Sequence, residues 1–301
     1  MFEGFIREHV EVDGLRIHTV SGGVGSGGAG PAVLLLHGYP QTLEQWAEVA
    51  ALLAAECTVV CTDLRGYGRS DKPADDGTTY TFRAMASDAL AVMSHLGHER
   101  FVVAGHDRGG RVAHRMALDA PERVAALVPC DVVPTWAMYH DVDRARAARY
   151  WQWYFLPLPA PFPERLIGAD PDYYFENCLV TNGGVGLEEG FGAEQLAAYR
   201  AAWRDPAMIA ASCADYRAGA SVDLEHDETD LDVLLDVPTF PVWGADGLLK
   251  DLFDIEAQWR RRCAEVHAAT VPGGHFFPDQ QPGATADAIL RAVRHVAGAL
   301  A

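Results

Sequence analysis

Residues 105–110, Gly-His-Asp-Arg-Gly-Gly, could hold a reactive carboxylate in an exposed position. They follow the apolar run 101–104 and precede a helix-compatible stretch. Glycines two positions before and after Asp107 allow a strand to turn sharply into a helix, which is how a nucleophile elbow exposes its central residue. A carboxylate that attacks a saturated carbon forms an ester that water can cleave, whereas serine would form a stable ether. Asp107 therefore predicts displacement at an sp3 carbon by a group already ionised at neutral pH.

A histidine is then needed to activate water against the ester. His275 lies between glycines and phenylalanines, directly after the apolar run 266–271, and follows the nucleophile in chain order. Two acids could orient its ring. We favour Asp131, because it ends an apolar run 24 residues after Asp107 (131 − 107), while Asp246, beside a glycine after the run 239–243, is the alternative.

The segment His37-Gly38-Tyr39-Pro40 ends another apolar run, residues 32–36. A loop in this position can supply one half of an oxyanion hole. The backbone N–H groups of Tyr39 and Arg108 are the expected donors. His37 and His106 flank these loops, and their expected role is to hydrogen-bond the turns.

Short apolar runs alternate with helical patterns from residue 32 to residue 131 and again after residue 239, which predicts parallel strands with crossover helices. Two alternating runs at 5–12 and 15–20, joined by Asp13-Gly14, predict an opening β-hairpin. The stretch between the two alternating parts is aromatic and helical. We therefore predict a core at 1–135 and 224–301, with a helical cap at 136–223 inserted between its two parts.

Two local motifs favour plain structural roles. Gly23-x-Gly25-x-x-Gly28 matches the dinucleotide fingerprint, but a strand follows it where a phosphate loop would open a helix, so a hairpin loop is expected. The charge run 223–230 is interpreted as a solvated linker.

Composition restricts the function classes. The chain has 301 residues, 49% of them hydrophobic, and a formal net charge of −18. That charge opposes binding to nucleic acid or to an anionic membrane. The first residues do not resemble a signal peptide, no apolar run approaches 18 residues, and a cytoplasmic location is predicted. Six scattered cysteines without a CxxC pair are expected to be buried thiols.

Taken together, the motifs resemble the haloacetate dehalogenases, an α/β-hydrolase family whose best-known members act on fluoroacetate. The resemblance rests on HGYPQT, DLRGYGRSDKP, GHDRGGRVAHRMALDAPERV, YWQWYFL, ADYRAGASVDLEHD and GGHFFPDQQP, together with the position of Asp131, and it covers nearly the whole chain. The GHDxGG pattern is shared with epoxide hydrolases and haloalkane dehalogenases. The two arginines at 108 and 111 are more specific to the family.

The resemblance implies that Arg108 and Arg111 grip a substrate carboxylate, for which a planar guanidinium is suited. It also implies a halide site of Trp153 and Tyr216. The family places a histidine beside that tryptophan, whereas this chain has Gln152, which donates only a neutral hydrogen bond.

The sequence thus predicts an α/β-hydrolase core with a helical cap that hydrolyses short 2-haloacids, with Asp107, His275 and Asp131 as catalytic residues. We expect no cofactor or metal, a small-molecule substrate and a homodimer. Two alternatives stay open: an epoxide hydrolase with cap tyrosines as acids, and a non-catalytic ligand-binding protein on the same fold.

Overall fold

The computed structural model describes residues 1–24, 30–140 and 142–300. Gly25 and Gly28 of the dinucleotide-like motif lie outside these residues, so the loop expected there is not described. Within the described ranges, no helix combines the length and the apolar character that crossing a membrane requires.

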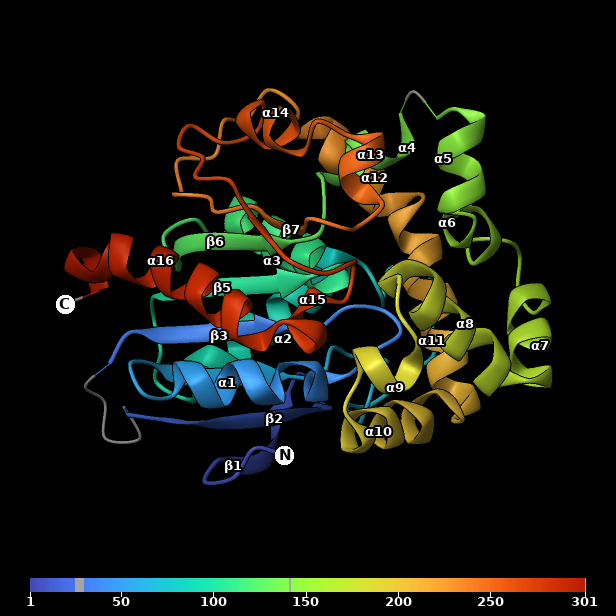
Figure 1. Ribbon diagram of the computed structural model, residues 1–301, viewed down its shortest axis with the longest axis horizontal. Coiled ribbons are helices and arrows are strands. Elements are labelled where there is room, and N and C mark those ends of the chain that lie inside the picture. The colour runs from blue at the N-terminus through green and yellow to red at the C-terminus, as the bar shows by residue number, and fades with distance from the viewer. Residues whose placement is uncertain (25–29, 141, 301) are drawn as a thin grey trace.

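One mostly parallel sheet forms the core (Figure 1). Its strand order is β1-β2-β4-β3-β5-β6-β7-β8; β1 and β2 run antiparallel to their neighbours, and the remaining pairs are parallel. The strands are β1 (Ile6–Val12), β2 (Leu15–Gly23), β3 (Ala32–Leu36), β4 (Thr58–Thr62), β5 (Phe101–His106), β6 (Val124–Cys130), β7 (Val242–Gly244) and β8 (Ala269–Val271). The predicted alternation and opening hairpin are confirmed, and the hairpin turn has positive φ at both Asp13 (48°) and Gly14 (81°), as a type I′ turn requires.

Helices cover both faces of the sheet. The helix α1 (Ala47–Leu53), which follows the short η1 (Leu43–Trp46), packs with α16 (Pro282–Leu300) on one face, and α2 (Phe82–His95) packs with α3 (Arg108–Asp119) on the other. Side chains alternate along the central strands: Leu34 joins the α2–α3 core, and Leu35 joins the α1–α16 core. Strands buried on both faces explain the continuous apolar runs in the sequence.

The chain between β6 and β7 is helical and lies at the ends of the strands, on the right in Figure 1. This confirms an inserted helical cap. Its helices are α4 (Thr135–Tyr139), α5 (Arg144–Arg149), α6 (Gln152–Phe155), α7 (Phe162–Ala169), α8 (Pro171–Gly183), α9 (Leu187–Gly190), α10 (Ala193–Trp203), α11 (Pro206–Gly219) and α12 (Val222–Thr229). After β7 come the short α13 (Leu249–Leu252) and α14 (Ile255–Arg260), and α15 (Phe277–Gln280) precedes α16.

The prediction of a solvated linker at 223–230 is wrong. Most of this run forms α12, and two of its aspartates, one helical turn apart, are buried. Asp223 accepts a hydrogen bond from the Phe82 N–H (2.9 Å), and Asp227 accepts from Arg262 Nη2 (2.9 Å) and the Trp136 N–H (2.7 Å). The charges therefore join the cap to the core. The six cysteines are free and buried, as predicted.

Candidate active site

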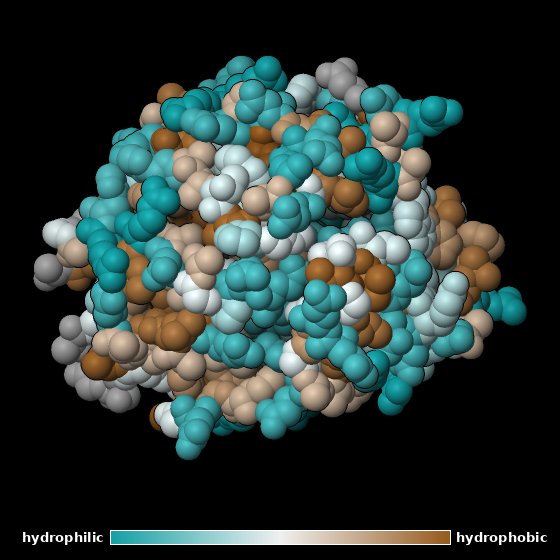
Figure 2. Space-filling view, viewed as in Figure 1, coloured by the Kyte–Doolittle hydropathy of each residue, from teal (hydrophilic) through white to brown (hydrophobic). Residues whose placement is uncertain are grey.

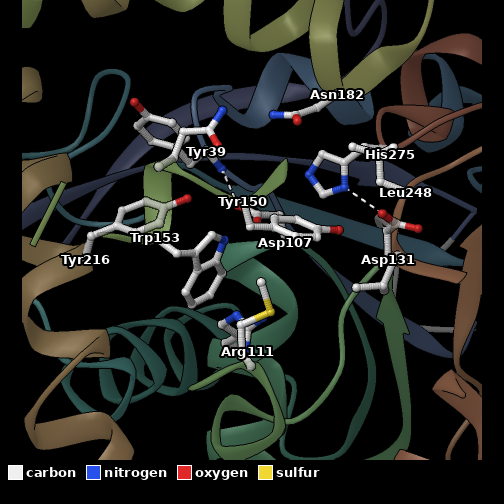
Figure 3. A pocket seen from close by; sticks show the side chains of 13 residues that line it. Tyr39, Asp107, Arg111, Asp131, Tyr150, Trp153, Asn182, Tyr216, Leu248 and His275 are labelled. Carbon is white, nitrogen blue, oxygen red and sulfur yellow. Dashed lines mark hydrogen bonds and ion pairs between the residues drawn. The ribbon is translucent and has the colours of Figure 1, made fainter. Parts of the chain in front are cut away.

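Asp107 sits at a sharp turn between β5 and α3 with φ 49° and ψ −112°, a conformation that costs energy for any residue other than glycine. Close packing of the elbow explains its glycines, since a Cβ on Gly105 would lie 2.2 Å from the Gly109 carbonyl oxygen. The predicted nucleophile elbow is therefore present as a geometry. Asp107 is only 6% exposed, and its side chain points into a cavity between core and cap (Figure 3).

The Tyr39 N–H donates to Asp107 Oδ1 at 2.9 Å. This contact requires Gly38, because a Cβ there would lie 2.5 Å from the Asp107 Cβ. The second expected donor, the backbone N–H of Arg108, belongs to the first residue of α3, where N–H groups lack partners within the helix. The Tyr39 N–H thus holds Oδ1 in place.

His275 Nδ1 lies 2.6 Å from Asp131 Oδ2, and the ring lies beside Asp107 in the cavity (Figure 3). Asp131 Oδ1 also accepts from the Gly244 N–H at 3.2 Å. Asp246 instead accepts from the Gly273 N–H at 3.1 Å. The structure thus places Asp131, and not Asp246, against the histidine.

The charges in this group shift one another's pKa values. Burial alone would raise the pKa of Asp107, but its charge interactions with His275 and Arg108 and the hydrogen bond from the Tyr39 N–H lower it overall. Burial alone would lower the pKa of His275, but its hydrogen bond and charge interaction with Asp131 raise it overall. Asp107 is therefore held as a carboxylate.

His37 and His106 play the structural roles expected of them. The Leu64 N–H donates to His37 Nε2 at 3.0 Å, and His106 Nε2 donates to the His275 carbonyl oxygen at 2.9 Å. Burial lowers the pKa of His106 to about 3, so its ring is neutral. The His106 ring also packs against the His275 ring, with the two centroids 4.6 Å apart, and so supports the loop that carries His275.

Arg108 and Arg111 differ in their partners. Arg108 is fully buried, and its Nε and Nη2 donate to the Asp215 carboxylate, with the Nε–Oδ2 distance 3.0 Å; only Nη1 lacks a partner. Arg111 lines the cavity, and its Nη1 donates to the neutral Val133 carbonyl (3.1 Å) and Thr135 Oγ1 (3.3 Å). Burial and the neighbouring Arg108 lower the pKa of Arg111. Arg111 thus carries the less compensated positive charge, and Arg108 is not one of the residues lining the cavity.

The three predicted halide contacts all line the same cavity. Gln152 and Trp153 come from α6 and Tyr216 from α11, and all three are buried. The Tyr216 and Trp153 rings meet edge to face with centroids 5.4 Å apart. Gln152 Nε2 lies 3.8 Å from Cys178 Sγ, a weak contact that leaves the amide available to a ligand.

Sequence reasoning assigned no role in this site to several of its residues. Asp215 holds Arg108 and also accepts from the Tyr67 hydroxyl at 2.6 Å, yet the sequence marks it only by its position next to Tyr216. Asn182 lines the cavity, its backbone carbonyl oxygen accepts from the His275 N–H at 3.2 Å, and no sequence signal singles it out. The other residues that close the cavity are Met138, Tyr150, Leu248 and Leu249.

The chain belongs to the α/β-hydrolase fold family, whose model matches residues 31–282. Within this family it is 52% identical over 288 residues to the fluoroacetate dehalogenase of a Burkholderia species, covering 95% of this chain and 93% of that protein. The resemblance to haloacetate dehalogenases is therefore confirmed.

More distant relatives include the soluble epoxide hydrolase of Corynebacterium sp. (strain C12), which is 32% identical over 93% of this chain and 94% of its own length. A solved structure from Nostoc sp PCC 7120 superposes with a TM-score of 0.94 at 44% identity, covering 98% of this chain and all of that one. A structure from Pseudomonas aeruginosa reaches 0.91 at 36% identity, covering 99% and 98% of the two chains.

Proposed function

We propose that this enzyme is a hydrolytic dehalogenase of haloacetates. The observation that carries the proposal is the shared cavity, in which an elbow aspartate lies beside the Asp131–His275 pair, the less compensated arginine and three hydrogen-bond donors on the cap. The nearest of the relatives described above acts on fluoroacetate, and the epoxide hydrolases are more distant.

In the first step, Asp107 Oδ2 attacks the α-carbon, the carbon–halogen bond breaks, and halide leaves with the bonding electron pair. Arg111, which lines the cavity, holds the substrate carboxylate and fixes the α-carbon before the nucleophile. Trp153, Tyr216 and Gln152 donate to the departing halide, on which negative charge develops. The product of this step is an ester at Asp107.

In the second step, His275 Nε2 takes a proton from water, and the oxygen of that water attacks the Asp107 carbonyl carbon. Asp131 holds the ring through Nδ1, so Nε2 is the nitrogen that faces the water. The Tyr39 N–H, with the Arg108 N–H, stabilises the oxyanion at Oδ1. The intermediate collapses as the bond between the Asp107 carbonyl carbon and Oδ2 breaks, and protonated His275 returns its proton to the departing oxygen. The 2-hydroxy acid leaves with that oxygen, and Asp107 keeps the oxygen of the water and returns to its carboxylate form by losing a proton to solvent.

The cavity size supports a short substrate. Its volume, as available to the centre of a water-sized sphere, is about 30 Å³. Since one water needs about 10–15 Å³ on this measure, the cavity holds about two to three waters. Among the 2-haloacids, haloacetate has the fewest atoms beyond the reacting carbon.

The test is to trap the ester. The His275→Asn variant is incubated with chloroacetate and digested, and mass spectrometry is expected to find one carboxymethyl group on the peptide that contains Asp107. Ion chromatography should show one equivalent of chloride released per chain. Steady halide release without an adduct, or an adduct on another residue, would disprove the mechanism.

Epoxide hydrolysis is the second candidate, because the hydroxyl-bearing side chains Tyr150 and Tyr216 both line the cavity. Burial raises the pKa of each well above its usual value, so each keeps its hydroxyl proton and can donate a hydrogen bond to an epoxide oxygen. An epoxide, however, would leave Arg111 buried without an anion. Faster turnover of styrene oxide than of chloroacetate would reverse the preference.

The domain boundaries at 136–223, the homodimer and the cytoplasmic location stay predictions. Exposed apolar side chains around α7 support an interface there, and Figure 2 shows apolar surface on this side of the cap. The residues concerned are Leu158, Phe162, Leu166 and Tyr173. Light scattering at micromolar concentration measures the oligomeric state, and Phe162→Glu with Leu166→Glu should yield monomers.

A further inference from the structure

Three metal-ligating side chains meet on the surface, away from the cavity. Glu265 and His267 lie just before β8, and His295 lies in α16. Both His267 Nε2 and His295 Nε2 approach Glu265 Oε1, at 2.6 Å and 2.9 Å. The three candidate ligand atoms all lie within 4.8 Å of one another. The long separation of His295 from the other two explains why motif spacing does not reveal the cluster.

The fold holds these side chains in place. The Thr239 N–H donates to the Glu265 carbonyl oxygen at 3.0 Å, and the His267 N–H donates to the Thr239 carbonyl oxygen at 2.9 Å. Residues 265 and 267 are two apart in this bridge-forming extended segment, so their side chains project to the same side. The Phe240 ring stacks on His267 with centroids 4.7 Å apart and meets His295 edge-on at 5.4 Å. The rings are therefore packed and partly preorganised.

The donor set matches a borderline divalent ion. Two imidazoles and one carboxylate are ligands that zinc accepts, at about 2.0–2.2 Å each. Tetrahedral geometry at these bond lengths separates ligand atoms by about 3.3 Å, so the 2.6 Å and 2.9 Å contacts need to open by less than about 1 Å.

We propose that Glu265, His267 and His295 bind one Zn²⁺-class transition-metal ion, with water completing the shell. The side chains are 37–47% exposed, so the ion and its water can reach the site. The site lies at the start of the last two strands, whereas His275 follows the end of β8. Such an ion takes no part in the proposed reaction. It ties α16 to the segment before β8. Because the ion binds the folded chain and not the unfolded chain, it raises the midpoint of thermal unfolding.

The experiment uses the full chain without a histidine tag, stripped with EDTA and dialysed. Isothermal titration with ZnCl₂ is expected to show one ion per chain at this site, and the thermal midpoint should rise with Zn²⁺. Loss of an outer-shell partner alone costs a metal site about 10- to 100-fold in affinity. Removing a direct ligand in His267→Gln, His295→Gln or Glu265→Gln should therefore cost at least about 100-fold.

The matched control is His140→Gln, which alters another surface His–Glu pair, with Glu228 at 3.6 Å and similar exposure but no second imidazole in the pair. This variant should bind Zn²⁺ as the parent does. Co²⁺ in place of Zn²⁺ should give the intense visible bands of a four-coordinate ion in the parent and lose them in His295→Gln. Absence of binding at millimolar Zn²⁺, or equal binding by the parent and His295→Gln, would overturn the proposal.

Discussion

Of the two arginines, we expect Arg111 to bind the substrate carboxylate. In Arg108 the guanidinium is already paired with Asp215, so the pair as a whole is close to neutral. Arg111 donates to a carbonyl and a hydroxyl and packs over the Trp153 ring, and among the described residues it has no carboxylate partner, so its charge remains available to the cavity. We expect Arg111→Leu to lower kcat/KM for chloroacetate more than removal of the Arg108 charge does.

The size of the expected fall in kcat/KM follows from the contact with the substrate carboxylate that Arg111→Leu removes. A hydrogen bond to a charged group contributes about 1.5–3 kcal/mol, and two unit charges about 4 Å apart near a protein surface attract by about 4 kcal/mol. Since each 1.36 kcal/mol is tenfold in rate, kcat/KM should fall between about 10-fold and 1000-fold. Arg111→Lys keeps the charge without the planar fork and should lose less.

Arg108 needs a paired design, because Arg108→Met alone would bury an unpaired Asp215, at a cost of about 3–5 kcal/mol in stability. The double variant Arg108→Met with Asp215→Leu removes both charges together. We expect its kcat/KM to fall less than that of Arg111→Leu. Chloroacetamide, a neutral substrate, should be little affected by Arg111→Leu. Equal losses on chloroacetate and chloroacetamide, or a larger loss in the double variant, would refute the assignment.

Three further outcomes are expected. Gly38→Ala should lower kcat by about 100-fold, because the Cβ of the alanine would lie 2.5 Å from the Asp107 Cβ and displace the Tyr39 donor. A circular dichroism spectrum like the parent's would separate this effect from unfolding. Gln152→His should raise the ratio of kcat/KM for fluoroacetate to that for chloroacetate, because a histidine can add positive charge beside the most charge-dense halide; an unchanged ratio would place Gln152 outside the halide contact. Hydrolysis of the ester should fail as pH drops through the raised pKa of His275, because a protonated ring cannot accept the proton of water. Asp131→Asn should move this acidic limb of the pH–rate profile to lower pH and reduce the rate on the plateau. A limb that does not move would exclude Asp131 as the group that raises the pKa of His275.

The sequence predicted the elements of the core well because their signals are local. Apolar runs flanked by glycine marked β3 and β5, and the glycines around Asp107 marked the turn that follows β5. The positions of Asp131 and His275 could also be predicted, since in a parallel sheet residues that follow strand ends gather at one edge. The sequence favoured Asp131 over Asp246, and the 2.6 Å contact with His275 agrees with that preference.

Pairings across long separations could not be predicted in this way. Asp223 and Asp227 are charged residues in a charged run, and only the fold brings the Phe82 N–H and Arg262 to them. Likewise, Arg108 has no visible partner in the sequence until α11 brings Asp215 beside it. A buried charge requires a partner, but the sequence does not say which residue supplies it.

These pairings bear on how the proposed reaction moves charge. Before the first step, negative charge lies on Asp107 and on the substrate carboxylate, and Arg111 compensates it. After that step the ester is neutral, and the displaced charge has moved to the halide. Trp153 and Tyr216 line the cavity beside the elbow, and the Arg111 guanidinium lies 4.4 Å from the centre of the Trp153 ring. Because a cation against this ring face polarises the indole N–H toward a halide, we propose that one arginine serves both the carboxylate and, through Trp153, the leaving group.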